Sequence, residues 1–544
     1  MRRCRGVLSS LIALGMVLGG PRGVRPAAAQ LYESTLQSLD YAPDPTARSP
    51  RLLGMGRLTL LDDVHNHISL WDFAGNPTGI AEAETASVVE YRPGTRSSEA
   101  IRDQWPSTRE QEVLRARQLR HGVETWRRGE GGTAYGLVGE VATLERSRPF
   151  SPVLEEREKF SVPTLNAAVN GHLPWIHGNR VDYAVRAGYS HESYDDQFFD
   201  FLELPQGSYL GRPSSAVDAR DAFTPDHQTV SSLGFGGAFA LRVSSGLKAA
   251  LGLDRVTKTV VATNEGLRSS SRTDEKRPFN IAQGSLIARL GHQVEFGADA
   301  RAWRSQSEEM FRWSVSAGQG NLALAGRGKR LSRREEGTSL RTRARWSAGP
   351  LELNASAGSS FRRLVITPWY PVNEGDPAGF NDFLDQAGFR PGADTLLLPA
   401  RVQNRRVKEN AYDLVAGAAW RLPHGRGVVA GEAHRSRRAT DTRLIGAGPN
   451  PVQWDFRAGA EVRCSSTFLA RAGGGYGLTD QDALTADDTY RHASATAGFG
   501  YLAPGSRWSL DLAYSVEWLD PDFADPTRSR ETRRQLAVQS RWPF

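Results

Sequence analysis

The chain has 544 residues, of which 39% are hydrophobic, and its mean hydropathy of −0.46 excludes a bundle of membrane-spanning helices. Its 68 basic and 61 acidic residues give a formal net charge of +7. Five arginines and no acid fall within residues 1–29, so the rest of the chain has 63 basic and 61 acidic residues, a balance that gives no support for nucleic-acid binding.

The N-terminus has the pattern of a secretory signal peptide. Three arginines precede an apolar run over 7–20, which is too short to span a bilayer as a helix and is followed by small residues. We expect cleavage near Ala29, and then a polar, proline-rich linker over 30–50. Cys4 would leave with the signal peptide, so we expect no disulfide for Cys464 in the mature chain.

The next segment, 51–84, lacks the alternation of a strand and is richer in apolar residues than the linker. It contains a Gly-Met-Gly stretch, an acidic pair, and an Asn-Pro dipeptide followed closely by glycine, which marks a tight turn. These motif residues are Gly54, Met55, Gly56, Asp62, Asp63, Asn76, Pro77 and Gly79. We interpret 30–83 as a linker and a lumenal plug, with Trp71 and Phe73 lining an apolar pocket. The alternative is that 51–84 is only a first strand and a loop.

The remaining chain, 84–544, repeats a two-residue alternation that is typical of β-strands with one apolar face. Within 507–519, the apolar set is Trp508, Leu510, Leu512, Tyr514, Val516 and Trp518. We count about 18 strands. The weakest are 84–93, 293–305 and 336–348, and losing two or four strands would leave 16 or 14.

Short turns alternate with long polar stretches, which fall at 193–228, 263–277, 306–335 and 366–403. Barrels of bacterial outer membranes show this asymmetry, with short periplasmic turns and long external loops. The predicted fold is therefore all-β, a transmembrane antiparallel up-and-down β-barrel with a best count of 18 strands and an N-terminal lumenal plug.

Aromatic residues at the ends of the apolar strand faces indicate contact with lipid. Trp508 and Trp518 are separated by about 33 Å along a strand, which at a tilt of roughly 40° covers about 25 Å, the height of an outer-membrane apolar band. We expect Trp508, Trp518 and Trp542 to form aromatic girdles. The chain ends on Phe544 after an amphipathic segment, which resembles the signal that the barrel assembly machinery recognises. These features predict the outer membrane of a Gram-negative-type bacterium.

The segment from Gly54 to Ile80 resembles the start of the long-chain fatty acid transporter (FadL-like) family and related secretion-shuttle barrels. In that family, a Gly-Met-Gly stretch leads through an acidic pair to an Asn-Pro-Ala motif inside the lumen. This chain matches those elements except at Thr78, which stands where the family has alanine. Family barrels have 14 strands, which is fewer than the best count here.

This resemblance implies passive transport of hydrophobic, fatty-acid-like small molecules. In the family, external apolar loops capture the ligand, and the plug shifts to release it. Two stretches here suit capture, 194–210 and 380–389, and both could be short amphipathic helices; the candidate contacts in the first are Phe198, Phe199, Phe201 and Leu202. The alternatives are a porin-like diffusion channel for polar solutes and a secretion or surface-assembly partner.

Several kinds of chemistry are not expected. His65 and His67 could share a metal ion on one extended strand, but such a pair is more often incidental, so we predict no metal site and no cofactor. No histidine lies in a recognisable catalytic motif, so we predict no enzyme. The expected partners are membrane lipid, a hydrophobic ligand and the barrel assembly machinery, without nucleic acid. We expect charged lumen positions to bond to one another and to the plug: Arg457, Glu461, Arg463, Asp511 and Glu517.

Overall fold

The structure is a computed structural model, and almost all of the residues that it describes are in strands. These residues are 49–60, 87–103, 111–129, 132–151, 154–174, 180–199, 223–265, 269–316, 323–368, 405–442, 446–447, 452–480, 489–505, 508–522 and 529–543. They include the short helix α2 (Pro50–Gly54) and the 3-10 turn η5 (Pro423–Gly425). No helix among these residues is long and apolar enough to cross a bilayer.

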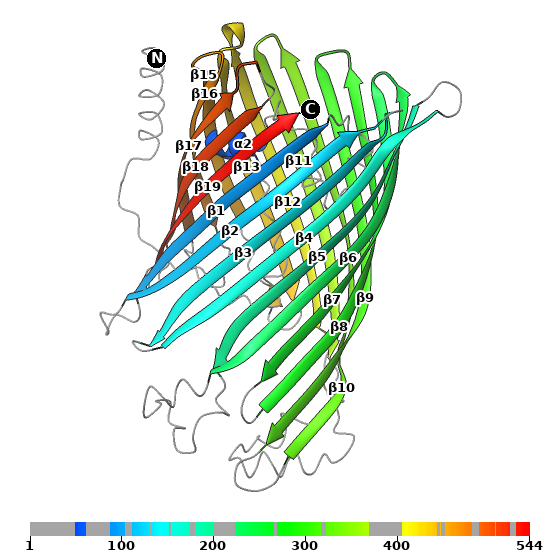
Figure 1. Cartoon of the computed structure of the whole chain (residues 1–544), viewed down its shortest axis with the longest axis vertical. Coiled ribbons are helices and arrows are strands. Elements are labelled where there is room, and N and C mark those ends of the chain that lie inside the picture. The colour runs from blue at the N-terminus through cyan, green and yellow to red at the C-terminus, as the bar shows by residue number, and fades with distance from the viewer. Residues whose placement is uncertain are drawn as a thin grey trace.

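The strands form one antiparallel sheet that closes on itself (Figure 1). The first nine are β1 (Val88–Asp103), β2 (Gln111–Arg128), β3 (Ala134–Ser151), β4 (Leu154–Pro174), β5 (Arg180–Phe199), β6 (Phe223–Ser244), β7 (Leu247–Glu265), β8 (Ser269–Leu290) and β9 (Val294–Ser316). The others are β10 (Ala323–Ala348), β11 (Leu351–Pro368), β12 (Arg405–Leu422), β13 (Gly427–Thr442), β14 (Gly446–Ala447), β15 (Val452–Arg463), β16 (Phe468–Asp480), β17 (Thr489–Leu502), β18 (Ser509–Asp522) and β19 (Ser529–Pro543).

Each long strand pairs with the strands before and after it in the chain, and β19 pairs with β1 to close the ring. The closing ladder runs from the pair Val88 and Pro543 to the pair Arg102 and Ser529. Because β14 is a two-residue piece between β13 and β15, the wall consists of 18 long strands. The predicted all-β antiparallel barrel and its best strand count are confirmed. Closure leaves no unpaired sheet edge, which a barrel needs in order to cross lipid.

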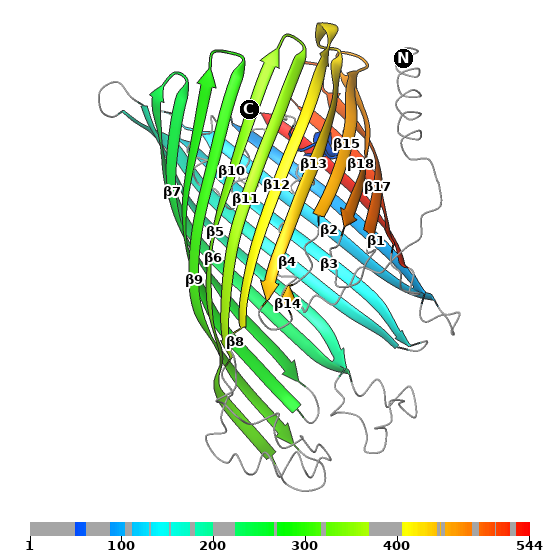
Figure 2. The same cartoon turned by 180° about the vertical axis from the view of Figure 1, so that it is seen from behind.

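The connections have the predicted asymmetry (Figure 2). Tight turns join strands at one end of the barrel, and several use glycines with positive φ, such as Gly291 (64°) and Gly349 (58°). The strands at the other end are longer than predicted. The stretches at 193–228 and 306–335 were expected to be loops, but β5 continues to Phe199, and β9 and β10 extend to Ser316 and from Ala323. Backbone pairing therefore continues beyond the apolar alternation.

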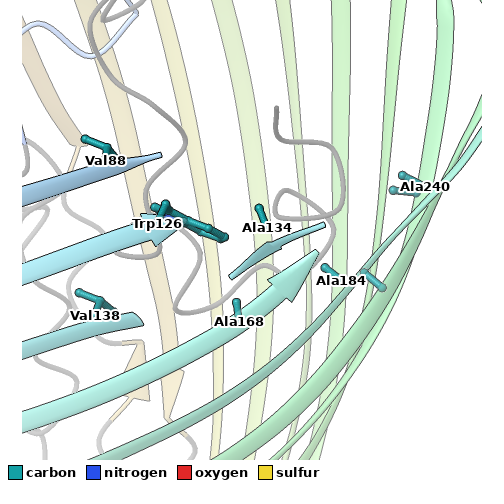
Figure 3. Packing of buried hydrophobic residues seen from close by; sticks show 9 residues of the cluster. Val88, Trp126, Ala134, Val138, Ala168, Ala184 and Ala240 are labelled. Atoms are coloured by element: carbon teal, nitrogen blue, oxygen red, sulfur yellow. The ribbon is translucent and has the colours of Figure 1, made fainter. Parts of the chain in front are cut away.

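The alternation places apolar side chains on the outer face of the wall and polar or small ones on the inner face. In β18, Tyr514 and Trp518 are 41% and 47% exposed, whereas the intervening Ser515 is fully buried. Small buried residues and Trp126 line the inner side of β1 to β7 near the short turns (Figure 3). Trp126 donates its indole N–H to Glu124, 2.6 Å away on the same face.

Cys464 follows β15, and in the structure of the whole chain it is disulfide-bonded. The only other cysteine in the sequence is Cys4, which lies outside the described residues. The expectation of no disulfide concerns the mature chain without residues 1–29, so it stays a prediction.

Candidate functional site on the inner wall

Residues 49–60 form a compact turn-helix segment on the inner face of the barrel. Ser49 accepts a hydrogen bond from the backbone N–H of Leu52 at 3.3 Å, and Pro50 occupies the first helical turn, so both ordinary helix-start signals are present. The helix ends where Gly56 and Arg57 adopt positive φ values of 85° and 62°. Figures 1 and 2 show α2 within the ring, and it contacts β16, β17, β18 and β19.

The backbone of this segment lies directly on glycines of the wall. A Cβ added to Gly459 would lie 2.0 Å from the carbonyl oxygen of Met55. A Cβ added to Gly473 would lie 2.3 Å from the backbone nitrogen of Gly56. Conversely, a Cβ on Gly56 would lie 2.4 Å from the carbonyl oxygen of Ala458. Because real Cβ atoms do not approach other atoms so closely, the close packing of the two backbones requires glycine on both sides. We call these wall glycines, Gly459 and Gly473, the glycine seat.

Apolar side chains of the segment are fully buried against the same wall. Leu53 packs with Ala513 and Ala537, while Met55 and Leu58 pack with alanines and a valine of β12 and β13. Burial of each such side chain contributes about 1.5–3 kcal/mol relative to exposure. The segment is therefore held by apolar packing as well as by polar contacts.

A buried ion-pair chain holds the helix. The Arg51 guanidinium contacts both oxygens of the Glu461 carboxylate, at 2.8 and 3.0 Å, in the bidentate geometry that arginine favours. Glu461 also accepts from Arg471 at 2.7 Å, and Arg471 lies 2.5 Å from Asp511 on the far side. Both arginines and Glu461 are almost fully buried. Removing one partner of such a pair costs about 3–5 kcal/mol, because it leaves a buried charge uncompensated.

The end of the segment is held by carboxylates of other strands. Glu432 accepts hydrogen bonds from the backbone N–H groups of Thr59 and Leu60, at 2.8 and 3.1 Å, and from the Thr59 hydroxyl. The Arg57 guanidinium donates to Glu517 at 3.0 Å. These bonds lie on both sides of the turn, so they fix its orientation as well as its position.

Thr496 on β17 bridges the turn of the segment. Its hydroxyl accepts from the backbone N–H of Gly56 at 2.9 Å and donates to the carbonyl of Gly54 at 3.1 Å. Because that hydroxyl is buried, it satisfies two backbone groups that would otherwise be left without partners.

A cluster around Asp455 supports this contact surface. The imidazoles of His434 and His492 lie 3.5 and 2.9 Å from its carboxylate oxygens. Arg457 lies 3.6 Å from the same carboxylate and donates to the carbonyl oxygen of Arg57 at 2.8 Å. The cluster therefore positions Arg457 against the backbone of the segment.

The inner wall on the other side of the barrel is also charged. On β7 and neighbouring strands, Asp254 accepts from Arg186 at 2.7 Å and from Gln283 at 3.2 Å. On β10, three successive inward positions are the arginines Arg341, Arg343 and Arg345. Arg345 pairs with Glu352 at 3.2 Å, and Arg341 lies 3.9 Å from Asp413.

The predicted site residues are only partly within the described chain. Gly54, Met55 and Gly56 form the turn described above. The other motif and pocket residues lie outside the described residues: Asp62, Asp63, Trp71, Phe73, Asn76, Pro77, Gly79, Phe201, Leu202 and Phe544, together with 380–389. Phe198 and Phe199 are the last residues of β5, so the expected helix over 194–210 is wrong for its first six residues.

The tryptophans expected in the girdles lie on the outer face. Trp518 and Trp542 are 47% and 43% exposed. Trp508 is half-buried, donates to the Ser540 hydroxyl at 2.8 Å and packs edge-on against Tyr501. Among the described residues, no group of three or more His, Cys, Asp or Glu side chains is placed to hold a metal ion.

Sequence reasoning anticipated the charged partners on the wall but not the glycine seat. Three of the five expected lumen positions, Arg457, Glu461 and Glu517, bond to residues 49–60. Asp511 pairs instead with Arg471, and no contact of Arg463 with the segment is found among the described residues. The signal for the seat was the run Gly473, Gly474 and Gly475 inside an otherwise regular strand, because glycine in a strand interior often marks a close backbone approach.

Comparisons with known proteins give weak structural likenesses. No protein-family model and no curated protein matches the chain. The toluene transporter TodX of Pseudomonas putida is similar at 11% identity, with 91% of this chain and 98% of that chain covered and a TM-score of 0.37. The toluene transporter TbuX of Ralstonia pickettii is similar at 12% identity, with coverage of 91% and 98% and a TM-score of 0.34. The ferric yersiniabactin receptor FyuA of Yersinia pestis is similar at 9% identity, with coverage of 84% and 80% and a TM-score of 0.41.

Proposed function

We propose that the protein is a passive transporter of hydrophobic small molecules across a bacterial outer membrane, with residues 30–83 as a lumenal plug. The observation that carries the proposal is the attachment of residues 49–60 to the inner wall through the glycine seat and buried ion pairs. A segment held in this way can carry the following residues into the lumen and restrict passage.

The placement in an outer membrane rests on the wall. Exposed apolar side chains project from alternate positions of most strands, and they include Leu251 and Leu253, which are 73% and 70% exposed. Exposing such a surface to water costs free energy, whereas contact with lipid chains does not. The same proposal includes signal-peptide cleavage near Ala29 and recognition of the C-terminal strand by the barrel assembly machinery.

The hydrophobic nature of the solute rests on the resemblance of the Gly-Met-Gly to Asn-Pro-Thr-Gly segment to fatty acid transporters. Gly54, Met55 and Gly56 have a structural role here that is consistent with this resemblance, because the two glycines make close backbone contacts with the wall and Met55 packs into it. In this proposal, Trp71 and Phe73 line the apolar pocket, and Phe198, Phe199, Phe201 and Leu202 contribute to capture at the outer end.

The test is a deletion of residues 30–80 that leaves the signal peptide and the strands intact. Reconstituted in a planar bilayer, the deleted barrel should conduct ions much more than the intact one. Equal conductance of two correctly folded barrels would contradict the plug. The solute class is tested separately by native mass spectrometry of the intact barrel in mild detergent, in which a bound fatty acid should be weakened by Trp71→Gln with Phe73→Gln.

The second candidate is a porin-like channel for polar solutes, and the charged inner wall favours it. The arginines of β10 face the lumen, and Arg341 is 66% exposed. If the intact barrel conducts ions well and retains no apolar ligand, this candidate replaces the first.

A further inference from the structure

A row of mostly basic side chains crosses the outer face of the barrel on six neighbouring strands. Strand register places its members directly opposite one another on six consecutive strands, β7 to β12. They are Arg255, Asn280, Arg304, Glu336, Arg363 and Lys408. The row contains four basic residues and one acid, so it has a net positive charge.

The alternation of each strand shows that this row faces outward. Arg255 is two positions beyond Leu253, which is 70% exposed, and Arg363 is two positions beyond the exposed Phe361. On β12, Lys408 lies four positions nearer to the loop-side end of the strand than the exposed Tyr412. The basic groups therefore lie on the outer face, nearer to the loops than these apolar residues.

A small pocket of about 160 Å³ opens beside this row. It is lined by Arg334, Glu336, Arg363, Val365 and Arg406. Glu336 is the one carboxylate among the described lining residues, and it contacts Arg334 at 3.3 Å and Arg363 at 3.2 Å. Within the described part of the chain, Arg406 forms no ion pair, and the buried Nε of Arg363 has no hydrogen-bond partner. Three guanidinium groups and one carboxylate give the pocket a net positive charge, which would attract a further anion.

Two apolar grooves on the outer wall end at basic residues. The first, of about 890 Å³, is lined by outward side chains such as Val185, Phe235 and Leu253, with Arg255 and Arg304 at its loop-side end. The second, of about 750 Å³, has a floor of outward alanines on β9 to β13. At its loop-side end the guanidinium of Arg435 lies 5.1 Å from the centre of the Trp454 ring, a cation–π contact.

We propose that this face binds phosphate-bearing lipids of the outer leaflet, with acyl chains in the two grooves and phosphate groups on the basic row. Arginine is suited to this role, because its planar guanidinium binds phosphate in a bidentate manner. The grooves favour a lipid over a free phosphate ion, since an ion alone would leave the apolar surface without a partner. This inference goes beyond the proposed transport function and rests only on the membrane placement of the barrel.

A row of outward charged residues on β2 to β5 has a different charge pattern. There, Arg117 lies opposite Glu145, Glu145 opposite Lys159, and Lys159 opposite Asp195. Charges of opposite sign alternate and neutralise one another, so this face offers no net attraction for an anionic headgroup. It provides a matched control on the same barrel.

The test compares lipid retention by the purified full-length barrel in mild detergent, measured by native mass spectrometry. The probe is bisphosphorylated lipid A, compared with its dephosphorylated form, with phosphatidylcholine and with inorganic phosphate. The test variant combines Arg304→Gln, Arg363→Gln and Arg406→Gln. The matched control combines Arg117→Gln and Lys159→Gln. A third variant carries lysine at the three test positions and keeps the charge.

We expect the test variant to retain the phosphorylated lipid at least about tenfold less than the wild type, because each basic residue near the surface contributes to headgroup attraction. The control and the lysine variant should stay within a few-fold of the wild type. Equal retention by the wild type and the glutamine variant would overturn the inference, as would full displacement by inorganic phosphate at millimolar concentration. If the membrane placement itself is wrong, no variant will retain any lipid, including phosphatidylcholine.

Discussion

A single methyl group added to the glycine seat should release residues 49–60 from the barrel wall. The Cβ of Gly473→Ala would lie 2.3 Å from the backbone nitrogen of Gly56 and 2.5 Å from the carbonyl carbon of Met55. Ordinary contacts begin near 3.4 Å, so the segment must move by about 1 Å. Such a shift would also lengthen the hydrogen bond from Gly56 to Thr496, which is now 2.9 Å.

The cost follows from the nature of the clashing atoms. Both are backbone atoms, which cannot rotate away as a flexible side-chain end could. Overpacking of this kind typically costs about 1–3 kcal/mol, and that range corresponds to a roughly 5- to 150-fold larger population of the released segment. Gly459→Ala places its Cβ 2.0 Å from the carbonyl oxygen of Met55 and should act in the same direction. The two sites contact the same residues, so their effects need not add.

The assay uses the arginines of the segment itself. Arg51 is buried in the attached state, so trypsin should cut after it only when the segment is released. The rate of cleavage, followed by mass spectrometry, should rise by the factor given above, and the bilayer conductance should rise with it. Gly139→Ala is the control, because a Cβ there meets nothing within 4 Å. If a correctly folded variant with both Gly459→Ala and Gly473→Ala is cleaved and conducts like the wild type, the proposed role of the seat is refuted.

Two other substitutions test the faces of the wall. Leu512→Arg places a charge near the middle of the outer apolar band and should destabilise the barrel by about 2–4 kcal/mol in a folding titration in lipid vesicles, whereas Thr532→Arg near the loop-side edge should cost about 0–1 kcal/mol. Equal effects at the two positions would argue against a lipid-facing band. On the inner face, Arg343→Glu should shift the reversal potential of the barrel lacking residues 30–80 toward cation preference, since a positive group in the lumen becomes negative. An unchanged reversal potential would mean that ions do not pass this part of the wall.

The strand number was predictable from sequence because the outer face must be apolar wherever it meets lipid. That requirement imposes the same alternation on every strand, and the short turns mark where each pair begins. The loop-side ends were not predictable in the same way. In β9 and β10, the residues beyond 305 and before 336 continue to pair although apolar and polar residues no longer alternate regularly there. Backbone pairing does not depend on the side chains, so it leaves no alternation in the sequence there.

The attachment of the N-terminal segment was harder to predict, because its contacts join distant parts of the chain. Arg51 and Glu461 are 410 positions apart, and nothing in either local sequence identifies the partner. The sequence did show that charged residues would face the lumen, and Glu461 and Glu517 are among those that bind the segment. It gave no geometric reason for Gly459, whose role depends on the path of another stretch of backbone.

The barrel ring and residues 49–60 are held in place by different kinds of contact. The ring is held by hydrogen bonds between all neighbouring strands, and opening it would expose backbone groups to lipid at a cost of several kcal/mol for each group. Among the described residues, the contacts of 49–60 are with neighbouring strands of the inner wall and include ion pairs, hydrogen bonds to Thr496 and Glu432, and three apolar side chains. Weakening these contacts can therefore free the segment while the barrel stays closed, which is the property that a movable plug requires.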